Sequence, residues 1–142
     1  MSQAEEIAMT TFSAIAREFP LLSCREVSDF PGQIAVLFPE QNGLEHDVLL
    51  SLDGEDELQF SVGNFLLEWF PCTEEERVEA YTRAVCGFLR GEYRVVEYWR
   101  GSSCIKAQLQ QPSRSGWNTI GTWSKLHWPS LRKLEQRILA NA

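Results

Sequence analysis

Few residues in this sequence could act on a substrate. The candidate nucleophiles and general bases are four cysteines and two histidines: Cys24, Cys72, Cys86, Cys104, His46 and His127. A nucleophilic cysteine needs a base and an orienting group close in space. Cys72 or Cys104 could pair with His127, but neither lies in the local context of a known cysteine protease, and the Gly-x-Ser-x-Gly motif of serine hydrolases does not occur. The sequence therefore assigns no catalytic residue.

The spacing of the cysteines does not suit a metal site. No two of them form a Cys-x-x-Cys pair, and their separations match no zinc ribbon. The first residues, MSQAEEIAMTTFSAIA, lack the positive charge and apolar run of a secretion signal, and no apolar run reaches the roughly 20 residues of a membrane span. We expect reduced thiols in a cytoplasmic protein without a metal or cofactor, with Cys86 packed as a small hydrophobic residue.

An acidic run and one isolated glutamate are candidates for cation binding and for general acid–base chemistry. The acidic run at residues 53–57 lacks the alternating ligands and terminal glutamate of an EF-hand loop, so we expect a solvated turn. Glu68 lies in an apolar, aromatic stretch. If its side of the strand is solvated, Glu68 has no special role; if a helix covers it, Glu68 would be a buried carboxylate with a raised pKa, suited to general acid–base chemistry. Glu68 and His127 are therefore the candidate titrating residues.

Charge is distributed unevenly along the chain, whose net charge is −7. Residues 1–80 contain 17 Asp/Glu and 3 Lys/Arg, whereas residues 81–142 contain 3 Asp/Glu and 10 Lys/Arg. Either the acidic half meets a basic partner, or the two halves attract each other within one fold, which we favour. We do not expect nucleic-acid binding, because the basic residues form no cluster, and no P-loop or Gly-x-Gly-x-x-Gly motif supports a nucleotide site.

The last third of the chain combines aromatic and basic residues. Rings that alternate with cations on strands can form a cation–π surface, and Trp and Tyr favour interfaces. We predict that this region binds another protein or a peptide; a platform for single-stranded nucleic acid is disfavoured by the negative total charge. The alternative is that the rings pack in the core beneath a helix. The candidate partner-binding residues are Tyr98, Trp99, Arg100, Trp117, Trp123 and Trp128.

The elements that must position these residues are organised around residues 57–70, ELQFSVGNFLLEWF. A turn at Gly63 and Asn64 pairs this stretch with itself, so that Val62 faces Phe65. Glycine at the first central position suits a type II′ turn, whose twist matches that of the flanking strands. One face of the hairpin is wholly apolar, and it therefore needs a cover.

Two amphipathic helices, at residues 3–19 and 73–90, can supply this cover. Ser2 and Thr73 are the expected N-caps, and Gly91 suits the position after the second helix. A third helix is predicted to start near Pro129. Its apolar face would consist of Leu131, Leu134, Ile138 and Leu139.

Short apolar or alternating runs predict further strands. These runs are residues 23–28, 33–38, 46–52, 93–99, 104–110 and 117–123. We therefore predict a single α+β domain over residues 1–142, in which one antiparallel sheet of about five to eight strands is packed by three helices. The expected order is a helix, four or five strands, a helix, two or three strands and a last helix.

This order of elements in a small acidic protein resembles the type III secretion chaperone-like fold. Members of that group are typically dimeric and hold an extended segment of a cargo protein on their surface, so the resemblance implies a homodimer with a protein partner. The chain departs from the group in its additional strands, around residues 57–70 and 117–123. It is also similar to small bacterial immunity proteins, which cap a toxin with an acidic or aromatic surface. Neither resemblance assigns a role to any residue.

Three functions follow from these observations. The one we favour is a non-enzymatic binding module, chaperone-like or immunity-like, that holds a partner protein through a sheet face or edge. The alternative is a small-ligand-binding or enzymatic domain with a cavity under a curved sheet, where Glu68 or His127 would titrate. A structural subunit of a larger assembly is the third.

Overall fold

The computed structural model describes residues 1–27, 34–126 and 132–141 and has an α+β architecture. The described residues contain two helices, α1 (Gln3–Glu18) and α2 (Glu75–Leu89). They also contain nine strands: β1 (Arg25–Glu26), β2 (Ile34–Phe38), β3 (Val48–Asp53), β4 (Glu57–Val62), β5 (Phe65–Trp69), β6 (Arg94–Arg100), β7 (Ser103–Ser113), β8 (Gly116–Ser124) and β9 (Leu134–Ala140).

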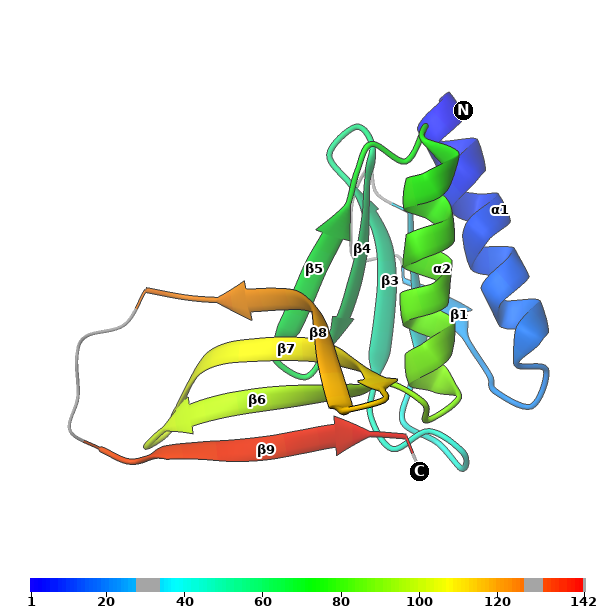
Figure 1. Ribbon diagram of the computed structural model, residues 1–142. Coiled ribbons are helices and arrows are strands. Elements are labelled where there is room, and N and C mark those ends of the chain that lie inside the picture. Colours follow the sequence, from blue (N-terminus) through cyan, green and yellow to red (C-terminus); the bar gives the residue numbers. More distant parts are fainter. Residues whose placement is uncertain (28–33, 127–131, 142) are drawn as a thin grey trace.

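The strands form two antiparallel sheets rather than the single sheet predicted from the sequence. Strands β1 to β5 pair in chain order, and α1 and α2 lie side by side on one face of this sheet (Figure 1). We call these elements the body. The other four strands pair in the order β8-β7-β6-β9 and project away from the body (Figure 1). We call this second sheet the arm.

The hairpin β4–β5 has the predicted register. Gly63 has a φ of +57° and Asn64 has a negative φ, which agrees with a type II′ turn. Its apolar face lies under α2, where the Phe60 ring meets the rings of Phe65 and Phe88 edge-on, each at 5.9 Å between centroids. The paired residues are Val62 with Phe65, Ser61 with Leu66, Phe60 with Leu67, Gln59 with Glu68 and Leu58 with Trp69.

The helix ends follow the predictions in part. The Ser2 hydroxyl accepts a hydrogen bond from the Glu5 backbone N–H at 3.1 Å, as expected for an N-cap. The Thr73 cap is wrong: α2 is preceded by Glu74, which makes no side-chain capping bond. Gly91 follows α2 with a φ of +80°, the left-handed conformation that ends many helices.

The predicted third helix is wrong where the structure describes it. Residues 134–140 form β9, which pairs with β6 along its whole length, from Leu134 opposite Arg100 to Ala140 opposite Arg94. The start of the predicted helix, residues 129–131, lies outside the described residues. Helical spacing of the apolar residues was therefore outweighed by the backbone hydrogen bonds that β6 offers at its free edge.

The base of the arm shares the core of the body. Val95, Ala107, Leu109 and Leu139 are buried in the same hydrophobic cluster as the helices and the hairpin. Gly121 of β8 lies against the Leu67 side chain of β5, where a Cβ atom would have no room. This close approach explains a glycine within a strand. Neither helix in the described residues is long and apolar enough to cross a membrane.

Tyr81 of α2 is fully buried at the centre of the body. Its hydroxyl donates a hydrogen bond to the Gln59 carbonyl oxygen at 2.8 Å, and its ring packs edge-on against Trp69 at 5.5 Å between centroids. Burial raises the pKa of Tyr81 well above its usual value, because the phenolate would have to form away from water.

We therefore expect alkaline pH to destabilise the protein through Tyr81. Above about pH 10 the unfolded chain releases the tyrosine proton while the folded chain keeps it, so the free energy of unfolding falls with rising pH by up to about 1.4 kcal/mol per pH unit. The measurement is urea unfolding from pH 8 upward, with Tyr81→Phe as the control. The stability advantage of the wild type over this variant should shrink as the pH rises; parallel pH profiles would contradict the prediction.

Candidate functional site

Three cations of the arm stack on three aromatic rings. The Arg94 guanidinium carbon lies 4.1 Å from the centre of the Trp117 ring, and the Lys106 ammonium nitrogen lies 4.5 Å from that of Tyr98. Arg137 covers Trp99 at 4.0 Å. Each distance lies within the roughly 6 Å over which a ring quadrupole attracts a cation. Three of the candidate partner-binding residues, Tyr98, Trp99 and Trp117, therefore each have a cation stacked on the ring.

The strand register distributes these pairs over both faces of the arm. Residues alternate between faces, so Val95, Glu97 and Trp99 of β6 share the face that packs on the body at its base. Arg94 and Tyr98 lie on the opposite face, which we call the outer face. The Arg94–Trp117 and Lys106–Tyr98 pairs therefore lie on the outer face, and the Arg137–Trp99 pair lies on the inner one.

The outer face carries exposed apolar side chains. Ile138 is 56% exposed, Trp117 42% and Leu134 38%. No helix in the described part of the chain lies over the projecting end of the arm (Figure 1). Polar bonds hold the stacked cations and rings in place: Arg94 Nε donates to Gln110 at 2.9 Å, and the Tyr98 hydroxyl donates to Gln108 at 3.1 Å. The outer face is thus an ordered surface of rings, aliphatic groups and cations.

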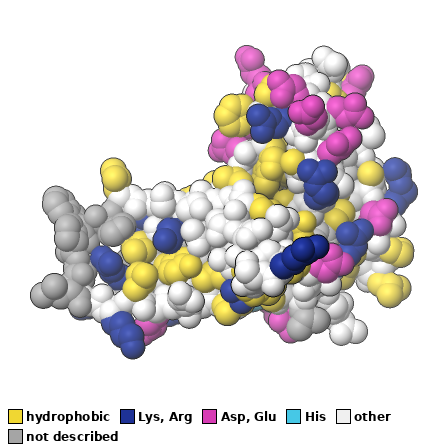
Figure 2. All heavy atoms as spheres, in the orientation of Figure 1, with side chains coloured by type: hydrophobic (Ala, Val, Ile, Leu, Met, Phe, Trp, Pro, Cys, Tyr) yellow, Lys and Arg dark blue, Asp and Glu magenta, His cyan; other side chains and the backbone are white. Residues whose placement is uncertain are grey.

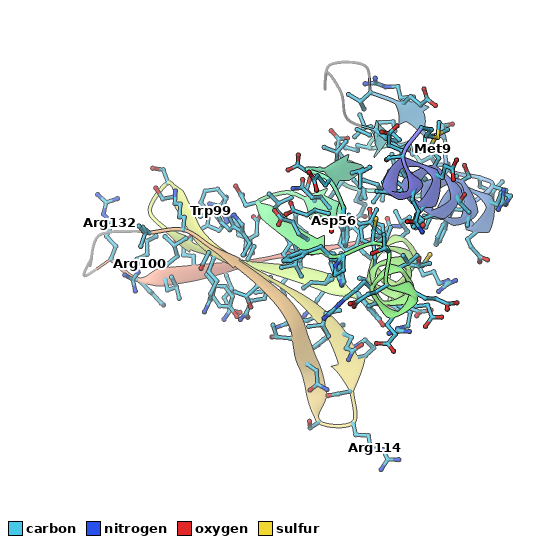
Figure 3. All side chains as sticks on the ribbon, turned by 90° about the horizontal axis from the view of Figure 1, so that it is seen from above. Met9, Asp56, Trp99, Arg100, Arg114 and Arg132 are labelled. Carbon is cyan, nitrogen blue, oxygen red and sulfur yellow. The ribbon has the colours of Figure 1, made fainter. Side chains whose placement is uncertain are left out.

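Charge separates between the body and the arm. The body, at residues 1–27 and 34–93, contains 17 Asp/Glu and five Lys/Arg, a net charge of −12. The arm, at residues 94–126 and 132–141, contains two Asp/Glu and eight Lys/Arg, a net charge of +6. Figure 2 shows acidic side chains gathered on the body and basic ones among hydrophobic side chains along the arm. Figure 3 places Arg100 and Arg132 at the far end of the arm and Arg114 at the tip of the β7–β8 hairpin.

A buried carboxylate that sequence reasoning missed joins the arm to the body. Glu97 of β6 is only 4% exposed. Its Oε2 atom accepts from the Asn64 backbone N–H at 2.7 Å and from Asn64 Nδ2 at 2.9 Å, and its Oε1 accepts from Trp99 Nε1 at 3.1 Å. Both oxygens are thus occupied, and Glu97 positions the β4–β5 turn rather than a substrate. The one available signal was a glutamate inside the apolar run VVEYW.

Asn141 makes a second connection that the sequence did not indicate. Its buried side-chain amide donates to the carbonyl oxygens of Leu89 and Gly43, at 2.7 and 2.9 Å. Its Oδ1 atom accepts from the Glu45 N–H at 3.2 Å. Asn141 therefore ties the end of β9 to the end of α2 and to the loop before β3.

The remaining predicted site residues are scattered. Glu68 is exposed on β5 and accepts a hydrogen bond from Gln59 Nε2 at 3.2 Å, so the hypothesis of a buried carboxylate at this position is wrong. His127 and Trp128 lie outside the described residues. Trp123 is half-buried against the core, and Arg100 is half-buried, with its Nε buried and without a hydrogen-bond partner.

The acidic turn between β3 and β4 contains one perturbed carboxylate. The neighbouring Glu68 carboxylate raises the pKa of Glu57, with further contributions from desolvation and from Asp53 and Asp56. No group of three or more His, Cys, Asp or Glu side chains within residues 1–27, 34–126 and 132–141 is arranged to hold a metal ion. The turn is a set of mutually repelling carboxylates, of which Glu55 is exposed and Asp53, Asp56 and Glu57 are half-buried.

The cysteines are free thiols, three of them buried and one exposed. Desolvation is the largest influence on each, and it raises the pKa of Cys24, Cys72, Cys86 and Cys104. A raised pKa keeps a thiol protonated at neutral pH, whereas a cysteine nucleophile needs its thiolate. His127, the base that could pair with Cys72 or Cys104, lies outside the described residues. Cys86 packs in the core as a small hydrophobic residue, as predicted.

An open trough runs along the side of the five-stranded sheet that the helices do not cover. Its main part holds about 680 Å³ and a neighbouring part about 400 Å³. The main part is lined by Leu49, Ser51, Asp53, Gln59, Ser61, Gly63, Asn64, Phe65, Leu66 and Trp123. Hydroxyl and amide groups and the Asp53 carboxylate form the polar lining of the main part, and the neighbouring part is lined by His46 and by the carboxylates of Glu40, Glu45 and Asp47. The trough can therefore bind polar groups.

Comparison of the chain with protein-family models, with curated proteins and with solved structures found no match.

Proposed function

We propose that this chain is a non-enzymatic protein-binding module and that the arm is the part that holds its partner. The observation that carries the proposal is the outer face of the arm, where two stacked cation–ring pairs lie beside the exposed side chains of Ile138 and Leu134. Exposed apolar groups clustered with aromatic and arginine side chains are typical of protein interfaces.

The stacked pairs suit binding because they are already ordered. Tyr98 and Trp117 are each held beneath a cation, and Arg94 is held on Gln110 by a hydrogen bond. A partner that docks on them does not need to immobilise these long side chains, and so loses less conformational entropy on binding. Rigid aromatic and arginine side chains commonly contribute most of the binding energy at interfaces.

The chemistry of the other groups supports binding over catalysis. The carboxylate oxygens of Glu97 are taken up by Asn64 and Trp99, and Glu68 is exposed. A catalytic acid or base needs a perturbed pKa and access to a substrate. The trough is an open surface lined by hydroxyl, amide and carboxylate groups and by His46, and it encloses no cavity in which one of them would be kept from water. No specific observation favours the small-ligand alternative.

The test is capture of a partner from native lysate by the full chain and by two variants. Ile138→Asp places a charge on the outer face of the arm, and Leu21→Asp makes the same kind of change at a body residue that is 93% exposed. We expect the wild type and Leu21→Asp to capture one stoichiometric protein, measured by light scattering, and Ile138→Asp to lose most of it. Thermal unfolding verifies that both variants fold. Equal capture by both folded variants would overturn the role of the arm.

A further inference from the structure

The edges of the two sheets differ in how well they are protected. Natural proteins shield sheet edges with charges, short strands or covering elements, because unpaired N–H and C=O groups can pair with another chain. Strand β1 has only two residues, and β5 is approached by β8 at Gly121. Strand β9 carries Glu135 and Arg137. These three edges have a recognisable form of protection.

Strand β8 is long and uncharged, and it is exposed on both sides of its contact with β5 at Gly121. Its nine residues, GWNTIGTWS, include no Asp, Glu, Lys or Arg, and most of them are exposed. It pairs with β7 and forms one edge of the arm. A register shift near Ile120 divides it into two halves, one that pairs with residues 110–113 and one that pairs with residues 106–109. The trough beside the body borders this strand at Trp123.

Cations surround this edge. Arg94 stacks on Trp117 of β8, and Lys106 is paired with Ser124 at the other end of the strand. Arg114 lies at the tip of the hairpin that leads into β8 (Figure 3), and Lys125 follows the strand. The arm has a net charge of +6 and the body one of −12. An acidic chain is therefore attracted to the arm and repelled from the rest of the molecule.

We infer that the edge of β8 takes up an extended acidic segment of the partner protein as an additional antiparallel or parallel strand. This inference rests on the proposed function and names the place and the chemistry of the partner. Backbone hydrogen bonds to β8 would supply affinity, and carboxylates of the segment would meet Arg94, which reaches Trp117 of β8 on the outer face, and Arg114 and Lys125 at the two ends of the strand. The strand itself needs no charge, because the neighbouring strands provide it.

A second copy of the chain fits this edge less well. Two β8 strands paired about a twofold axis would bring two arms of charge +6 together, and like charges brought together cost free energy. An acidic strand meets no such repulsion. Charge complementarity thus favours a different, acidic protein segment over self-association through β8.

The experiment uses three synthetic peptides with the full chain. The first alternates threonine with glutamate, the second replaces each glutamate with lysine, and the third keeps the glutamates but is N-methylated at alternate residues, which removes the donors of one strand edge. At low salt we expect the glutamate peptide to bind at least about tenfold more tightly than the lysine peptide, and N-methylation to remove most of the affinity. Hydrogen exchange should show new protection of amides in β8 and not in β9.

A matched pair of variants tests whether the peptide binds at β8. Thr122 of β8 and Gln136 of β9 are both exposed on the outer face, and Thr122→Glu and Gln136→Glu each add one negative charge. The Thr122 variant should weaken binding of the glutamate peptide more than the Gln136 variant does. An equal effect of both would show a response to overall charge and would overturn the assignment to β8.

The remaining outcomes also decide where the segment binds, what charge it has and whether a second copy of the chain takes its place. Equal binding of the N-methylated peptide would place the segment on a face rather than at the edge, and equal binding of the lysine peptide would overturn its acidic character. Protection of β8 that grows with protein concentration alone, with a dimer in light scattering, would make a second copy the occupant. If no peptide binds, the inference fails; the proposed function then stands if lysate capture is lost with Ile138→Asp, and fails too if it is not.

Discussion

Replacing Glu97 with alanine is expected to lower the free energy of unfolding by about 2–4 kcal/mol. The variant loses the acceptor for the Asn64 backbone and side-chain N–H groups and for the Trp99 indole N–H. The Glu97 carboxylate is buried, and hydrogen bonds to a buried charged acceptor contribute more than ordinary neutral ones. Urea unfolding of the wild type and the variant measures the difference.

Two further variants serve as a graded change and as a control for this prediction. Glu97→Gln keeps one acceptor oxygen but turns an N–H group toward a donor. Its free energy of unfolding should therefore lie below that of the wild type and above that of Glu97→Ala. Glu135→Ala, at an exposed position of the neighbouring β9, should change stability by no more than about 0.5 kcal/mol. If Glu97→Ala is as mild as Glu135→Ala, then Glu97 does not hold the arm to the β4–β5 turn.

Replacing Asn141 with alanine is expected to lower the free energy of unfolding by a similar amount, about 2–4 kcal/mol. The variant leaves the Leu89 and Gly43 carbonyl oxygens and the Glu45 N–H without their partner. Asn141→Asp should be nearly as damaging, because its carboxylate would face those two carbonyl oxygens. Denaturant unfolding measures both variants.

The control for this prediction is another asparagine of the arm. Asn118 is exposed on β8, and Asn118→Ala should change stability by no more than about 0.5 kcal/mol. A loss for Asn141→Ala that is no larger than this would show that packing alone holds the end of β9. The expected, larger loss would show that the hydrogen bonds of the Asn141 amide help to hold the arm to the body.

Glu97 and Asn141 together bear on the proposed function. Glu97 ties β6 to the β4–β5 turn, and Asn141 ties the end of β9 to α2 and to the loop before β3. With its base in the shared core and two polar connections, the arm is held at a fixed angle to the body. A fixed arm presents its outer face and the β8 edge already in place, which lowers the entropic cost of binding a partner.

The elements predicted correctly are those whose signals are local. The hairpin at residues 57–70 contains its own turn glycine, its own alternation and its own apolar face, and the register predicted from the pairing of Val62 with Phe65 is the observed one. The two helices likewise have their apolar stripes and Gly91 within the segment itself. Interactions within about 15 residues were enough to determine these parts.

Strand β9 shows where local signals fail. In the sequence LEQRILA, Leu134 and Ile138 are four residues apart, which fits one helix face, and they also lie an even number of residues apart, which fits one strand face. The sequence of this segment satisfies both periods. The free edge of β6 decided the outcome, because pairing with it satisfies backbone groups of both strands.

The sequence by itself determined the α+β class, the central hairpin, the two helices and a last third in which aromatic residues alternate with cations. Only the tertiary structure decided that the strands divide into a body and an arm, and that Tyr98, Trp99 and Trp117 each have a cation stacked on the ring. Glu97 reaches its partner across 33 residues and Asn141 across as many as 98. Such contacts depend on how distant strands pack, and no pattern within either segment encodes that arrangement.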